Sequence, residues 1–398
     1  MERCRILVVG AGLAGLALAR ALRQAGFAPE VIERADAWNG AGTGMYLPAN
    51  GVRALRALGL EAAVAGRAAP IPSQRLLDHR GRLLADIDLR ELWGDVGPCL
   101  ALPRVDLHQV LREGVPVRLG RTVGSLERVD GPVGVGFDDG GEGEFDLVVG
   151  ADGLHSGIRR LAGDRRPPVA VGQQSWRFLA ACPPEVTTWT VLLGRGASFL
   201  AIPVGGGAVY CYADTTDGNG TGDGDPVGRL RERFAGFAAP VPGLLEQLDD
   251  PDPPGHPPGV PRTPPTDPPG HPPGVPRTPP PRVHAAPIQQ VAAEQWGRGA
   301  VVLVGDAAHG MSPNMAEGAS LAFEDALVLA ACVRDAATVG QALAAFVARR
   351  SPRTGWVRAQ THRRDRTRDL PPALRNLTLR TLGRRIFQSN YRPLLPPI

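Results

Sequence analysis

The sequence predicts an α/β fold in which a mainly antiparallel sheet is inserted into a parallel, doubly wound unit with a helical C-terminus. Three observations predict it. The apolar run 4–9 leads into a glycine-rich turn and a segment with helical spacing. Residues 170–215 hold apparent strands without helices between them. From about residue 320 onward the spacing of apolar residues is largely helical.

The glycine-rich turn has the spacing Gly-x-Gly-x-x-Gly, with Gly10, Gly12 and Gly15 between a strand and a helix predicted over 13–24. Gly10 permits the tight turn, Gly12 permits close approach of a pyrophosphate, and Gly15 permits close packing of helix on strand. The free N–H groups of the first helical turn, at Leu13 and Ala14, would face the phosphates.

A second strand is predicted over 29–33, and it ends in an acidic residue. Glu33 lies eighteen residues after Gly15, where a carboxylate can accept hydrogen bonds from the ribose hydroxyls of an adenosine. Its neighbour Arg34 is included in the same predicted site. The sequence therefore predicts dinucleotide binding at this turn.

Two later segments repeat the pattern of a buried strand followed by a turn. Asp152-Gly153 follows the apolar run 145–150, and Gly305-Asp306 ends the run 298–304. Together with the first turn, these are what one bound FAD would need if the chain returned to it three times.

Composition sets the class of protein. The chain is 43% hydrophobic and 21% charged, as in a soluble globular protein. Its five cysteines show no paired spacing, so we expect a reduced, cytoplasmic setting and no metal. The first strand begins almost at the N-terminus and no apolar run approaches about 20 residues, so we expect neither signal peptide nor membrane span. The sequence contains no lysine, which excludes Schiff-base chemistry.

The elements between these turns follow from local spacing. Helices are predicted over 48–58 and 104–111, the second opening with Arg104, which could reach a phosphate. Strands are predicted over 74–79, 83–87, 122–129, 133–137, 174–181, 187–193, 199–203 and 208–213. Six aromatic residues of the last four strands form either a wall for a flat substrate or an ordinary core: Trp176, Phe178, Trp189, Phe199, Tyr210 and Tyr212.

The final third combines a repeat, a long helix and a basic stretch. Residues 252–265 recur identically at 267–280, which predicts an exposed polyproline-like loop that is either a recognition segment or a tolerated insertion. A helix is predicted over 320–334, with later breaks near Pro352, Pro371 and Gly383. The arginines of 349–368 either steer an anionic cofactor or nucleic acid, or form a solvated helix face.

These motifs resemble those of the FAD-dependent aromatic hydroxylases, the single-component flavoprotein monooxygenases whose prototype is para-hydroxybenzoate hydroxylase. Residues 152–159 resemble the family's DG motif. Residues 305–309, followed by Pro313, are similar to its GD motif. The resemblance covers nearly the whole chain in the expected order.

The resemblance implies a Rossmann-type FAD-binding domain with an inserted antiparallel substrate domain. The first comprises 1–72, 98–168 and 296–398 with the helical C-terminus, and the second comprises 73–97 and 169–295, including the proline-rich loop 251–281.

Particular residues take roles in the implied FAD site. Glu33 would hold the adenosine ribose, Arg104 would approach the pyrophosphate, and Asp306 would bind the ribityl hydroxyls. Pro313 would lie beside the reacting edge of the flavin. The backbone from Met315 through Ala316 to Gly318 would face the pyrimidine end of the ring.

The chain departs from the family pattern at two positions of that loop, where the family often has glycine for Ala316 and glutamine for Glu317. An ionised Glu317 near reduced flavin would oppose reduction, so we expect its side chain to point away. Asp152 would link the flavin and nicotinamide sites, or else cap the helix that begins near Ser156. His309 is expected to be structural.

The implied reaction is NAD(P)H- and O2-dependent hydroxylation of an aromatic or polyketide-like small molecule through a flavin hydroperoxide, in secondary metabolism or aromatic catabolism. FAD would be bound non-covalently. Tyr210 or Tyr212 could assist deprotonation of a phenol, and Arg177 could hold an acidic group.

Three other functions compete with this one. They are a reductase or oxidase of a lipid or polyketide intermediate without oxygen insertion, a flavin-dependent halogenase, and a non-catalytic flavoprotein or scaffold. The missing lysine and the lack of a Trp-x-Trp-x-Ile-Pro segment weigh against the halogenase. As partners we expect substrate and dioxygen, no nucleic acid and no membrane, in a monomer or homodimer.

Overall fold

The computed structural model describes residues 4–38, 43–216, 225–248, 282–291, 295–368 and 370–398, and the proline-rich repeat lies outside these ranges. A parallel sheet lies at its centre. Its strands run in the order β17 (Gly297–Arg298), β18 (Val301–Leu303), β11 (Leu147–Gly150), β1 (Ile6–Val9) and β2 (Glu30–Ile32). All neighbours are parallel except β17 and β18. The carboxyl ends of β1, β11 and β18 therefore meet at one edge, where all three predicted turns begin.

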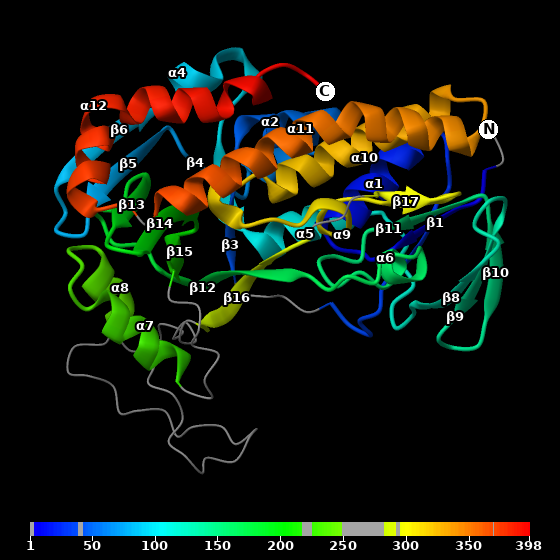
Figure 1. Ribbon diagram of the computed structural model, residues 1–398, viewed down its shortest axis with the longest axis horizontal. Helices are drawn as coiled ribbons and strands as arrows, with labels where there is room; N and C mark the ends of the chain where they lie inside the picture. The colour runs from blue at the N-terminus through cyan, green and yellow to red at the C-terminus, as the bar shows by residue number, and fades with distance from the viewer. Residues whose placement is uncertain (1–3, 39–42, 217–224, 249–281, 292–294, 369) are drawn as a thin grey trace, which may run out of the picture.

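Helices cover this sheet and set its edge. Helix α1 (Leu13–Gln24) packs against α10 (Gly318–Asp335), which in turn packs against α2 (Ala49–Ala57) and α11 (Val339–Thr367). Figure 1 shows α10 and α11 running side by side across the molecule. The apolar faces of these helices and of β1 share one core cluster, which includes Leu16, Leu55, Phe323 and Phe346.

Two small antiparallel sheets flank the centre. One has the order β3 (Gly44–Leu47), β7 (Leu100–Pro103), β4 (Ala69–Pro70), and the other β10 (Glu142–Phe145), β9 (Val133–Phe137), β8 (Val123–Glu127). The short helices of this region are α3 (Glu61–Ala65), α5 (Arg104–Arg112) and α6 (Gly157–Leu161).

A seven-stranded sheet supplies the second layer. Its order is β16 (His284–Gln290), β12 (Val169–Ala181), β15 (Ala208–Thr215), β14 (Ala197–Gly205), β13 (Trp189–Leu193), β5 (Ser73–Asp78) and β6 (Leu83–Asp88). Every pair is antiparallel except β13 with β5. Helices α7 (Pro226–Phe234) and α8 (Val241–Glu246) cover one face. The fold class predicted from the sequence is confirmed.

The C-terminal helices correct two predicted breaks. Pro352 lies inside α11, and Gly383 lies inside α12 (Pro372–Tyr391), so only the break near Pro371 is found. Arg350 and Arg353, on either side of Pro352, are bound to carboxylates of α10, which holds the helix together despite a proline penalty of about 3 kcal/mol. Gly383 serves packing, since a Cβ there would lie 3.0 Å from the Cβ of Ala85 in β6.

Further short elements join these parts: α4 (Leu89–Trp93), α9 (Asp306–His309) and the 3₁₀ turns η1 (Gly94–Val96), η2 (Pro313–Met315) and η3 (Arg392–Leu394). The strand predicted over 298–304 is divided into β17 and β18 by a turn at Gly299. Among the described helices, none combines the length and the apolar character needed to cross a bilayer.

Candidate functional site

The three glycines of the first turn have separate roles. Gly10 has φ +103°, and a Cβ there would lie 2.6 Å from the carbonyl oxygen of Ala151. A Cβ at Gly15 would lie only 1.9 Å from the carbonyl oxygen of Gly10. A Cβ at Gly12 would meet no heavy atom within 4 Å. Gly10 and Gly15 therefore permit close packing, and Gly12 borders open space at the start of α1.

Polar contacts from Glu33 and His108 hold this glycine-rich turn in place. The Glu33 carboxylate accepts hydrogen bonds from the backbone N–H groups of Ala11 (2.8 Å) and Ala35 (3.0 Å). His108 of α5 has Nε2 2.9 Å from the carbonyl oxygen of Ala11. Burial lowers the pKa of His108, so a neutral imidazole donates this bond. No side chain caps the N-terminus of α1, which leaves its first N–H groups for a ligand.

Asp152 has the capping role that the sequence left open. Its carboxylate accepts hydrogen bonds from the Ser156 hydroxyl and from the N–H groups of Gly157 (2.7 Å) and Ile158 (3.1 Å), at the start of α6. Its predicted link between flavin and nicotinamide stays a prediction. Arg159 of the same helix is buried and donates to the carbonyl oxygen of Ala307 (3.0 Å), which ties α6 to the segment after Gly305.

The turn at Gly305 packs directly against α1. Gly305 has φ +57°, and a Cβ there would lie 2.9 Å from the Cβ of Ala14. Its N–H donates to the Asp325 carboxylate at 3.0 Å. Asp306, the first residue of α9, is exposed. The fold therefore brings the first and third predicted turns into contact.

Three charged side chains from different elements lie close enough to interact electrostatically. The Arg104 side chain is accessible to solvent, and partial burial lowers its pKa. The negative charge of Asp306 raises the pKa of Arg104 and the positive charge of Arg177 lowers it, so both lie nearby. Arg104 opens α5, Asp306 opens α9 and Arg177 lies on β12.

The predicted catalytic residues share one face of the seven-stranded sheet. Arg177 is paired with Tyr212 across β12 and β15, and its guanidinium lies 5.6 Å from the centre of the Tyr212 ring. Tyr210, two residues earlier, packs against β3 so closely that a Cβ at Gly44 would lie 2.3 Å from its own. Burial raises the pKa of Tyr210 to about 12 and that of Tyr212 well above 10. Both are neutral hydroxyls at pH 7.

The other aromatic residues divide between the two faces. Trp176, Phe178 and Phe199 belong to the core cluster beneath α7, where Phe199 contacts Phe234 at 5.6 Å between ring centres. Trp189 lies on the opposite face, in the cluster that contains Tyr210. The core proposed from sequence is therefore present beneath α7, and the wall for a flat substrate on the opposite face stays a prediction.

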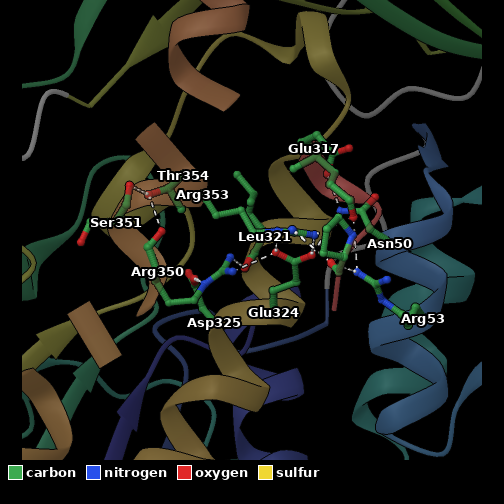
Figure 2. A network of polar contacts seen from close by, with 12 residues as sticks. Asn50, Arg53, Glu317, Leu321, Glu324, Asp325, Arg350, Ser351, Arg353 and Thr354 are labelled. Atoms are coloured by element: carbon green, nitrogen blue, oxygen red, sulfur yellow. Dashed lines mark hydrogen bonds and ion pairs between the residues drawn. The ribbon is translucent and has the colours of Figure 1, made fainter. Parts of the chain in front are cut away.

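The loop before α10 has an unusual backbone and a buried carboxyl. Ala316 has φ +54°, the left-handed region that glycine adopts most easily. Glu317 is buried, and its carboxylate accepts a hydrogen bond from Asn50 Nδ2 at 2.9 Å (Figure 2). Gly318 is exposed, and no side chain caps α10. The side chain of Glu317 thus points into the protein, and its orientation relative to a flavin stays a prediction.

These residues fit an FAD. The open space at Gly12 beside the uncapped α1 suits a pyrophosphate. Arg104 adds a cation on α5, the helix whose His108 contacts Ala11. The uncapped N-terminus of α10 suits the charge of a reduced isoalloxazine.

Comparison with known proteins also points to FAD binding. Residues 3–183 and 272–362 match the family described as FAD binding domain. Aurachin C monooxygenase/isomerase of Stigmatella aurantiaca is 34% identical over 371 residues, covering 90% of this chain and 88% of that protein. The 3-amino-4-hydroxybenzoate 2-monooxygenase of Streptomyces cremeus is 32% identical over 393 residues, covering 91% and 86%.

The chain belongs to the family of FAD-dependent aromatic hydroxylases. It is an FAD-dependent monooxygenase, and the comparisons support this activity rather than the reductase or oxidase alternative. FAD is its cofactor, and NAD(P)H is the co-substrate typical of the family. The structure of Klebsiella pneumoniae HpxO with FAD and uric acid has the same fold, with a TM-score of 0.84 and 24% identity over 98% of this chain and 97% of that one.

Three residues for which the sequence predicts no contact shape the site of this hydroxylase. His108 reaches the first turn, Arg159 reaches the segment after Gly305, and Asn50 reaches Glu317. Their partners lie 97, 148 and 267 positions away. The roles predicted for Glu33, Arg104, Asp306, Pro313 and Met315 toward particular FAD atoms stay predictions.

The backbone of Ala316 gives a stability prediction. Ala316→Gly should raise the free energy of unfolding by about 0.5–1 kcal/mol, because relief of left-handed strain exceeds the entropy that glycine adds to the unfolded chain. Ala319→Gly, within helix α10, should instead lower it by about 1 kcal/mol. Urea unfolding measures both, and a destabilised Ala316→Gly protein would contradict the prediction.

Proposed function

We propose that this enzyme hydroxylates an electron-rich aromatic compound whose acidic group is bound by Arg177. One observation carries the proposal. Arg177 lies near Arg104 and Asp306 and over the ring of Tyr212, and within the described ranges it has no carboxylate in salt-bridge contact. A guanidinium in such a place is suited to a carboxylate or phenolate of a substrate.

Residues of the sheet face complete the proposed pocket. The hydroxyls of Tyr210 and Tyr212 would orient or share a proton with a substrate phenol as neutral groups, since their raised pKa values disfavour tyrosinate. Apolar side chains that cluster with Tyr210 would exclude water: Leu200, Met311 and Tyr46. When bound, FAD supplies the electron transfer from NAD(P)H and the activation of dioxygen.

The relatives suggest the range of substrates. Two are named for quinolone chemistry or an aminohydroxybenzoate, namely the 2-heptyl-3-hydroxy-4(1H)-quinolone synthase of Pseudomonas aeruginosa and the Streptomyces cremeus enzyme. We therefore include secondary metabolism in the proposal, with a cytoplasmic enzyme that is a monomer or homodimer. An acidic aromatic substrate is favoured over a neutral one by Arg177.

The test compares matched substrates. The purified holoenzyme is given NADH or NADPH, labelled dioxygen, and phenolic or quinolone compounds with and without a carboxylate, and incorporation of one labelled oxygen is measured. Arg177→Gln should raise KM for an accepted acid by about tenfold to a hundredfold, through loss of a charge-assisted hydrogen bond. KM for its neutral analogue should not change.

Two results would overturn this assignment. An unchanged KM together with weaker FAD binding would place Arg177 in the cofactor site. Equal turnover of acid and neutral analogue by the original enzyme would remove the need for an anion-binding residue.

A further inference from the structure

The outward side of α12 is unusually apolar. Ten large hydrophobic side chains are exposed in the described chain, and five of them belong to residues 370–386: Leu370, Leu374, Leu377, Leu382 and Ile386. Leu374 and Leu377 are 53% and 60% exposed. Leu370 lies just before α12, and we call the four exposed residues within the helix the outer face of α12. Figure 1 shows this helix at the edge of the molecule, over β5 and β6.

The opposite side already anchors the helix. Gly383 lies against Ala85 of β6, and Phe387 and Tyr391 are buried. The outer residues keep about a third to three fifths of their surface exposed, and a helix that is apolar on both sides is suited to a second partner.

The same segment is strongly basic. Residues 370–398 contain five arginines and no aspartate or glutamate: Arg375, Arg380, Arg384, Arg385 and Arg392. Arg375 donates to the carbonyl oxygen of Gly194, and Arg384 pairs with Glu91 of α4. Arg380 and Arg385 are exposed on the turns that carry the leucines.

We propose that the outer face of α12 binds an anionic membrane surface, with the leucines among the lipid chains and the arginines at the head groups. Exposed leucines combined with arginines on one helix are typical of helices that lie in a membrane interface. A second copy is the weaker candidate, because a two-fold interface would set the same arginines against each other.

This inference is independent of the substrate proposed above. It changes the expectation that the protein has no membrane partner. In this proposal α12 adsorbs to the membrane surface and does not cross the bilayer. Tyr391, at the end of α12, donates a hydrogen bond to the carbonyl oxygen of Met315 at 3.1 Å. The membrane-bound helix would therefore contact the loop that precedes α10.

The test is flotation of the full-length holoenzyme with lipid vesicles. We expect binding to vesicles that contain phosphatidylglycerol, at least about tenfold above phosphatidylcholine alone, and reduced binding in high salt. Leu374→Glu/Leu377→Glu and Arg380→Gln/Arg385→Gln should each reduce binding by about tenfold or more. Val169→Glu, at an equally exposed apolar residue outside α12, should bind as the original protein does.

Sedimentation velocity and FAD absorbance are measured for each variant to detect misfolding. If the leucine variant is misfolded, the Arg380→Gln/Arg385→Gln variant decides whether α12 binds the vesicles. Equal binding to both kinds of vesicle, or full binding by the α12 variants, would overturn the proposal. A dimer that Leu374→Glu/Leu377→Glu converts to monomers would assign the surface to a second copy instead.

Discussion

Replacing Arg350 with methionine should lower the free energy of unfolding by about 3–5 kcal/mol, because two buried carboxylates would lose the cation between them. Arg350 is 1% exposed, and its guanidinium lies 2.7 Å from Asp325 Oδ1 and 2.9 Å from Glu324 Oε2. It also donates to the carbonyl oxygen of Leu321. Figure 2 shows these contacts joining α11 to α10.

The effect should reach the FAD site through Asp325. Burial alone would raise the pKa of the Asp325 carboxyl, but the charges of His309 and Arg350 outweigh burial and lower the pKa. The second oxygen of this carboxylate accepts hydrogen bonds from His309 Nε2 (2.6 Å) and from the N–H of Gly305. His309 thus has the kind of structural contact that was expected, and loss of Arg350 should also weaken FAD binding.

Chemical unfolding of the variant measures the first effect and titration with FAD the second. Arg349→Met is the matched control, since Arg349 is the exposed neighbour on the same helix and should change stability by no more than about 0.5 kcal/mol. A loss below about 1 kcal/mol for Arg350→Met would show that Arg353 and His309 are sufficient partners for Glu324 and Asp325.

The same ion pairs show what the sequence could not predict. From the sequence, the arginines of 349–368 form either a solvated helix face or a basic patch, because a single sequence shows only their helical spacing. Arg350 and Arg353 instead contact Glu324 and Asp325, which belong to an earlier helix. Helix crossing decides which arginine is buried, and that crossing is not encoded in local spacing.

Local signals were sufficient elsewhere. The predicted helix 13–24 coincides with α1, and the packing roles of Gly10 and Gly15 depend on neighbours within a few residues or on the adjacent strand. The period-2 pattern of 208–213 correctly placed Tyr210 and Tyr212 opposite Cys211. The helix breaks predicted near Pro352 and Gly383 were wrong, because tertiary contacts outweighed the intrinsic tendency of these residues to end helices.

Glu317→Gln should stabilise the protein relative to the original chain, and this gain in the free energy of unfolding should be larger at pH 8 than at pH 5. Burial is the main cause that raises the pKa of the Glu317 carboxyl from 4.5 to about 8, and the negative charge of Glu324 raises it further. The hydrogen bond from Asn50 and the charge of Arg353, which faces it from α11, act in the opposite direction.

The sign follows from proton linkage. Below pH 4.5 the carboxyl is protonated in both folded and unfolded chains and has no pH-dependent effect. Between 4.5 and 8 only the folded chain keeps the proton, so the original protein loses up to about 1.4 kcal/mol of stability for each pH unit. Above pH 8 the loss is complete.

Glutamine has no such proton, and its amide can donate to Asn50 Oδ1, which is buried without a hydrogen-bond partner among the described residues. We expect Glu317→Gln to exceed the original protein by about 2–4 kcal/mol at pH 8 and by little at pH 5. Denaturant unfolding across this range measures the difference. The exposed carboxylate variant Glu142→Gln is the control, and a difference independent of pH would refute the linkage.

The proton on Glu317 also bears on the departure from the family pattern. A neutral carboxyl at the start of α10 would not oppose negative charge on reduced flavin, whereas an ionised one would. The reduction potential of the bound FAD should therefore fall more steeply above pH 8 in the original enzyme than in Glu317→Gln. Parallel potential curves for the two proteins would mean that the carboxyl lies too far from the ring to act on it.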